Sequence, residues 1–156
     1  MKKKELFAIE SALNSVKARS ANIKFSYAVV KNSKLIAGEL EAIREVAKLG
    51  PDMEKYNQDR IALLQEHAQR DDNNNPVLNE HGTAYKYVDE AVVNAALKEF
   101  NDNNAAVLEQ NKQKEAEVNA LLDEEIDLPF HKVDIEFFPP EISPAELENL
   151  MVMLAE

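Results

Sequence analysis

The sequence predicts a mainly α-helical protein, built as a long antiparallel helical hairpin with a short β ribbon at its turn. Apolar residues recur at helical spacing over two long stretches, at about residues 23–69 and 89–122. Between them lies one polar, turn-forming segment, from Asp71 to Tyr87. The chain has 156 residues, which suits one domain (1–156), and only 3 glycines, which suits helices.

The first two helices are expected at about residues 3–16 and 23–69. The polar segment Arg19-Ser20-Ala21-Asn22 separates them and offers a break and a new N-cap. Because proline lacks an amide hydrogen, we expect a kink or short break at Gly50-Pro51. The second helix should bury one apolar stripe, made of Ile23, Tyr27, Val30, Ala37, Leu40 and Ile43 and continued by Val46 and Ala47.

The middle segment has no helical period. Val77-Leu78 and Tyr85-Lys86-Tyr87-Val88 are strand-like, and Gly82 between them can take the positive φ that a turn requires. We therefore expect a ribbon over about 76–88, with Tyr85 and Tyr87 lining one side.

The third long helix is expected at about 89–122, with Asp89 as its N-cap. The run 101–104, rich in Asn and Asp, weakens its middle because these side chains compete for backbone hydrogen bonds. The helix should pack antiparallel to the second one. The residues expected to be buried between them are Leu40, Ile43, Leu97 and Phe100.

The C-terminal part predicts an extended arm at about 123–142 and a short helix at about 144–154. Pro139-Pro140 stiffens the end of the arm. Ser143, Pro144 and Glu146 occupy the N-cap, N1 and N3 positions, which together favour a helix start.

The composition limits the function classes. The net charge is −11 and the pI about 4.8, which disfavours direct binding of nucleic acid or of an anionic membrane. No apolar run reaches the roughly 18 residues that span a bilayer. The chain has no cysteine, which excludes disulfides, thiolate metal sites and a cysteine nucleophile.

No catalytic residue, cofactor site or metal site is predicted. Asp71, Asn73 and Asn75 match the first ligands of a calcium loop, but Pro76 and Gly82 stand where the loop needs Gly and Glu. No two of the three histidines have the spacing that places two metal ligands on one helical face. The sequence also lacks a glycine-rich phosphate loop and a nucleophile elbow.

An apolar group near the C-terminus is the candidate partner-binding surface. These side chains either cap the core of the hairpin or form a surface that docks on a protein partner or on another copy. The group consists of Phe130, Phe137, Phe138, Leu150, Met151 and Met153.

The order of several segments resembles small proteins encoded by tailed bacteriophages and prophages, of the DUF1617-like kind. The segments are 6–13, 37–43 (Ala-Gly-Glu-Leu-Glu-Ala-Ile), Asn75-Pro76-Val77, 122–128 and 142–147. The resemblance implies a viral gene product in the cytoplasm of a bacterial host or in the virion. The expected role is a non-enzymatic interaction protein in virion assembly or an assembly factor. The alternative is an acidic inhibitor, or nucleic-acid mimic, that blocks a host defence or DNA-binding protein.

Overall fold

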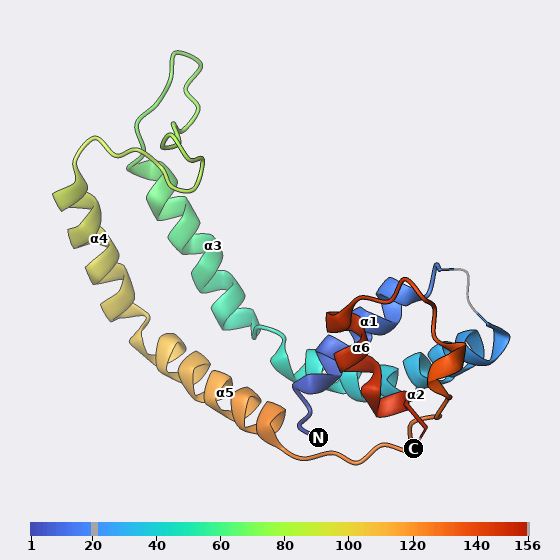
Figure 1. The fold of residues 1–156 in the computed structure, drawn as a ribbon. Helices are drawn as coiled ribbons and strands as arrows, with labels where there is room; N and C mark the ends of the chain where they lie inside the picture. Colours follow the sequence, from blue (N-terminus) through green and yellow to red (C-terminus); the bar gives the residue numbers. More distant parts are fainter. Residues whose placement is uncertain (20–21, 156) are drawn as a thin grey trace. The chain divides into compact units, whose positions relative to one another are not determined.

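The computed structural model describes residues 1–19 and 22–155, and these residues are mainly helical, as the sequence predicts. The predicted break at 19–22 falls in part on Ser20 and Ala21, which lie outside the described residues. The elements, drawn in Figure 1, are α1 (Glu5–Val16), α2 (Ile23–Ala47), α3 (Pro51–Glu66), α4 (Glu90–Asn103), α5 (Ala105–Asp123), η1 (Ile135–Phe137), α6 (Pro144–Leu150) and η2 (Met151–Met153). The two labelled η are 3-10 helices.

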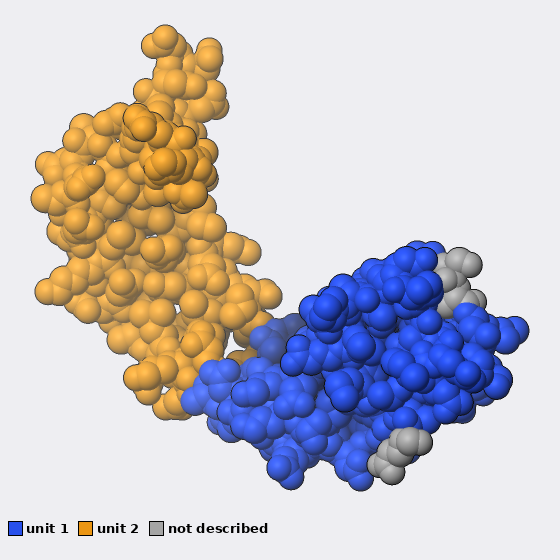
Figure 2. All heavy atoms as spheres, viewed as in Figure 1, with its two compact units in different colours: residues 1–48, 116–156 blue, residues 49–115 orange. Residues whose placement is uncertain are grey.

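The chain divides into two compact units, which Figure 2 colours separately. Unit 1 comprises Met1–Lys48 and Ala116–Glu156, so it is assembled from two separate stretches of chain. Unit 2 is the continuous stretch Leu49–Glu115.

Unit 1 contains a continuous apolar core. Helix α1 packs against both α2 and α6, and Val133, Phe138 and Met153 belong to the same core. Leu6, Leu40, Leu150 and Met153 are completely buried. The buried residues of this contiguous core are Leu6, Ile9, Ala12, Leu13, Val16, Phe25, Ala28, Val29, Ile36, Leu40, Val133, Phe138, Leu150 and Met153.

The apolar stripe predicted on α2 is wrong except at Leu40 and Ile43, because Ala37, Val46 and Ala47 are also exposed. Ile23, Tyr27 and Val30 are 82%, 53% and 44% exposed. The physical reason is that α2 has two apolar stripes at helical spacing, and only one of them can face α1. The face that starts at Phe25 is buried and continues to Leu40 and Ile43. The other stripe is left on the surface.

The arm predicted at 123–142 begins after Asp123, the last residue of α5, and has no α-helix; η1 and a turn at 140–141 interrupt it, and specific hydrogen bonds fix it within unit 1. The Asn32 side chain, 1% exposed, donates to the His131 carbonyl at 3.0 Å and accepts from the His131 amide at 2.8 Å. Val133 and Leu154 form an isolated parallel β-bridge, in which the Val133 amide donates to the Met153 carbonyl at 2.8 Å. These bonds hold the backbone of the arm at two successive points.

The predicted capping box of α6 is confirmed. The Ser143 hydroxyl accepts from the Glu146 amide, and the Glu146 carboxylate accepts from the Ser143 amide. The same carboxylate accepts from the Ser15 hydroxyl and from Arg19, whose Nη1 lies 3.0 Å from Oε2. Glu146 therefore joins the start of α6 to the end of α1.

In unit 2, both predicted long helices are interrupted, as the sequence signals suggest. Gly50 caps α3 with Pro51 at its first position, and α2 has already ended at Ala47. Asn104 separates α4 from α5, and Asp89 caps α4 as predicted. Helices α3 and α4 contact each other, with the Tyr56 and Phe100 rings stacked at 5.2 Å between centroids.

A hairpin of two long helices that share one core is not confirmed. Leu40 and Ile43 are buried in unit 1, whereas Leu97 and Phe100 are only half-buried in unit 2. The interruptions at Gly50-Pro51 and Asn104 explain this difference, because each proposed long helix becomes two shorter ones.

The predicted ribbon at 76–88 is not confirmed as a pair of strands. Isolated antiparallel bridges join Ala68 to Tyr87, Arg70 to Pro76 and Leu78 to Tyr85. Gly82 has φ +66°, as its turn requires, and its amide donates to the carbonyl of Asn79. Polar turn residues between the bridges prevent a longer ladder.

Candidate binding groove on unit 1

The structure separates the six apolar residues that the sequence groups as a candidate surface. Phe138, Leu150 and Met153 are 8%, 0% and 0% exposed, so they belong to the core of unit 1 and offer almost no surface to a partner in the folded protein. Phe130 and Phe137 are half-buried, and Met151 is 58% exposed. The two half-buried phenylalanines each line a hollow beside α2.

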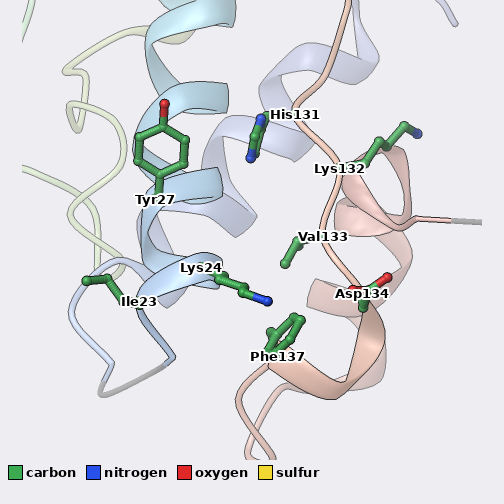
Figure 3. A pocket seen from close by; sticks show the side chains of 8 residues that line it. All are labelled: Ile23, Lys24, Tyr27, His131, Lys132, Val133, Asp134 and Phe137. Atoms are coloured by element: carbon green, nitrogen blue, oxygen red, sulfur yellow. The ribbon is translucent and has the colours of Figure 1, made fainter.

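The first hollow lies between the start of α2 and the arm and has a volume of about 330 Å³. Helix α2 contributes residues of its exposed apolar stripe, and the arm contributes the opposite wall. Its lining residues, shown in Figure 3, are Ile23, Lys24, Tyr27, His131, Lys132, Val133, Asp134 and Phe137.

Aromatic contacts shape this hollow. The Tyr27 and His131 rings meet edge to face, with centroids 5.2 Å apart and an interplanar angle of 81° (Figure 3). The Lys24 ammonium lies 4.2 Å from the centre of the Phe137 ring, within the range of a cation–π contact. Each contact joins a side chain of α2 to a side chain of the arm, so the two walls of the hollow are in direct contact.

A second hollow, of about 550 Å³, follows along α2. It shares His131 and Lys132 with the first, and the two together are called the α2 groove below. Its other lining residues are Lys31, Asn32, Lys34, Leu35, Pro129 and Phe130.

The lining of the α2 groove is cationic, although the chain is acidic overall. Lys24, Lys31, Lys34 and Lys132 line it, against a single carboxylate, Asp134. Within residues 1–19 and 22–155, none of these four lysines forms an ion pair with a carboxylate. Lys132 instead donates to the Val152 carbonyl at 2.7 Å. Two of the ammonium groups, those of Lys24 and Lys31, lie close to aromatic rings, at 4.2 Å from the centre of Phe137 and 5.9 Å from that of Tyr27.

Sequence reasoning missed most of this groove and treated Tyr27 as part of the helical core. A usable signal is nevertheless present in the sequence. Between Glu10 and Glu39 the chain has no Asp or Glu, yet it has five cations: Lys17, Arg19, Lys24, Lys31 and Lys34. In a chain of net charge −11, such a stretch indicates a surface of opposite sign.

The residues considered for calcium serve a turn instead. One oxygen of Asp71 accepts from the amides of Asn73 and Asn75, at 2.9 and 2.8 Å. The Asn75 amide is the main cause that lowers the pKa of Asp71. Within the described part of the chain, no three His, Cys, Asp or Glu residues are grouped so that they could hold a metal ion.

None of the helices among the described residues has the length and apolarity needed to cross a lipid bilayer. No protein-family model, no curated protein and no solved structure matches this chain.

Proposed function

We propose that this chain is a non-enzymatic interaction protein of bacteriophage origin, which binds a protein partner through the α2 groove. Its role would be in virion assembly or as an assembly factor, in the cytoplasm of the bacterial host. The phage origin rests on the resemblance of the segment order. The observation that carries the binding role is the exposed stripe of α2 beside a hollow lined by aromatic rings.

The apolar surface of α2 supports this proposal. An α-helix in a folded unit normally turns its apolar stripe inward, and α2 does so with Phe25 and its neighbours. Ile23, Tyr27 and Val30 form an additional stripe that the described residues of unit 1 leave 82%, 53% and 44% exposed. Apolar surface beside a concave, aromatic-lined hollow is typical of binding sites.

The fixed geometry of the arm also supports it. Asn32 and the Val133 bridge hold the wall of the groove in place before any partner arrives. A preformed wall loses little conformational entropy on binding, so more of the contact energy appears as affinity.

Partner capture with matched variants tests the proposal. The baits are the wild-type chain, the groove variant Ile23→Ala/Tyr27→Ala, and the control variant Ile61→Ala/Val92→Ala. The control removes two apolar side chains of unit 2 that are 50% and 51% exposed. Each bait is incubated with lysate of infected bacteria, and captured proteins are quantified by mass spectrometry.

We expect a protein that the wild type and the control variant capture equally, and that the groove variant captures about tenfold less. All three baits should unfold at similar temperatures, because the substituted side chains are exposed. A groove variant that retains every partner would overturn the proposal. A captured virion protein would support the assembly role, whereas a host defence or DNA-binding protein would support the inhibitor alternative.

A further inference from the structure

The α2 groove and the surface beside it combine two kinds of binding surface, apolar and cationic. Along α2, the exposed apolar residues Ile23, Tyr27 and Val30 are interspersed with Lys24, Lys31 and Lys34. A ligand that satisfies both kinds must itself carry both apolar and anionic groups.

The charge of the groove differs from that of the molecule that bears it. Four lysines face one carboxylate in the groove, whereas the whole chain has 29 acidic and 18 basic residues. Lys24 and Lys31 already lie close to aromatic rings, at 4.2 Å from Phe137 and 5.9 Å from Tyr27. An incoming carboxylate can therefore pair with an ammonium while a neighbouring apolar side chain packs on the same ring.

From this pattern, and resting on the proposed function, we infer that the partner presents an acidic peptide segment with interspersed apolar or aromatic residues. Its carboxylates pair with Lys24, Lys31 and Lys34. Its apolar side chains enter the hollow between Tyr27 and Phe137.

Two observations favour such a peptide over a nucleic acid. The Asp134 carboxylate lines the first hollow, where it repels phosphates and carboxylates alike but can accept a hydrogen bond from a peptide amide, which a phosphodiester backbone does not offer. A chain of net charge −11 also repels a polyanion at a distance, and a few lysines release too few counterions to compensate.

Selection from a random peptide library tests the inference. An mRNA-displayed library of short random peptides is selected on the full chain, on Lys24→Gln/Lys31→Gln/Lys34→Gln, and on Lys55→Gln/Lys98→Gln/Lys112→Gln. The last variant removes the same charge from unit 2 and serves as the matched control. Enriched peptides are sequenced and their affinities measured by fluorescence anisotropy.

We expect the full chain and the control to enrich peptides rich in Asp and Glu together with Leu, Phe, Tyr or Trp. The groove lysine variant should bind these peptides about tenfold more weakly, from three exposed ion pairs of modest strength. Tyr27→Ala should lower the affinity for these peptides by a similar factor. Added salt should lower the affinity of both the full chain and the control variant.

The outcomes separate this inference from the proposed function. If the enriched peptides lack acidic residues but their binding still depends on Tyr27, the inference of an acidic partner is wrong, whereas the proposed binding of a protein partner still stands. If the full chain enriches no peptide more strongly than the groove variants do, both the acidic-peptide inference and the proposed function are wrong. Binding of single-stranded DNA oligonucleotides or of phosphatidylserine vesicles in preference to the acidic peptides would overturn the inference in favour of those ligands.

Discussion

Units 1 and 2 are both helical, but they are stabilised in different ways. Unit 1 buries a continuous core that draws on α1, α2, the arm and the C-terminal helices. In unit 2, all of whose residues are described, only Tyr56, Ala68 and Val93 are buried. Side-chain hydrogen bonds also link its segments, such as the bond from the Gln65 amide to the Tyr85 hydroxyl at 2.9 Å.

The comparison shows that the helix propensity of a segment alone does not determine its local stability in the folded protein. Helix α5 has no buried residue, yet its sequence is as strongly helix-forming as that of α1. Tertiary packing supplies most of the stability of a helix in a protein, so unit 2 should open locally at a lower free energy than unit 1.

The largest expected effect is in the core of unit 1. Met153→Ala should lower the free energy of unfolding by about 2–5 kcal/mol, because it leaves a cavity at a fully buried site. Met151→Ala is the matched control, and its 58% exposed side chain should change stability by less than about 0.5 kcal/mol. Urea denaturation followed by circular dichroism measures both, and equal effects would mean that Met153 is not part of the core.

Asn32→Ala should lower the free energy of unfolding by about 1–3 kcal/mol, because it leaves the His131 amide and carbonyl without the Asn32 side chain as their partner. The arm should loosen at the same time. Hydrogen exchange would then be faster at residues 131–133 and unchanged in α3 and α4. Unaltered exchange in the arm would show that Asn32 does not fix it.

In unit 2, Tyr56→Phe should lower the free energy of unfolding by about 1 kcal/mol. The substitution keeps the ring that stacks on Phe100 and removes the hydroxyl that donates to Asn101 at 2.7 Å. Faster hydrogen exchange should be confined to α3 and α4. If α1 and α2 lost protection to the same extent, the two units would unfold together, and the contrast between them would fail.

The carboxylate of Glu146 makes the link between α1 and α6 sensitive to pH. The Ser15 hydroxyl, together with Ser143 and Arg19, lowers the pKa of Glu146 from 4.5 to about 2. A lowered pKa stabilises the folded state above pH about 4.5, and this contribution is lost as the pH falls toward 2. Glu146→Gln should therefore lower the melting temperature at pH 7, and the difference from wild type should shrink below pH 4. The exposed Glu148→Gln serves as control.

The smallest expected effect is that of calcium on the loop of unit 2. Asp71 already binds the amides of Asn73 and Asn75, and Pro76 and Gly82 stand at the two positions that decide calcium binding. Millimolar calcium should shift the melting temperature no more than magnesium does. A calcium-specific rise that saturates at low concentration would contradict this prediction.

Local signals in the sequence predict helix ends well. Asp89 and Ser143 accept the amide hydrogen bonds expected of N-caps, and Gly50-Pro51 separates two helices, because each depends on nearby backbone geometry alone. The choice between the two apolar stripes of α2 depends on which face α1 and the arm cover. That information lies in residues far away in the sequence, so the spacing of apolar residues within α2 alone wrongly predicts a buried Tyr27.

The discontinuity of unit 1 has a consequence for how the chain folds as it is synthesised. Arg19 and Glu146, which pair across its surface, are 127 positions apart in sequence. The core of unit 1 therefore cannot close until its second stretch, from Ala116 onward, has left the ribosome, whereas unit 2 is complete earlier. If unit 2 folds first, it shortens the flexible loop that must close to bring α1 and α6 together, and so lowers the entropic cost of that step. The less stable unit would then assist the folding of the more stable one.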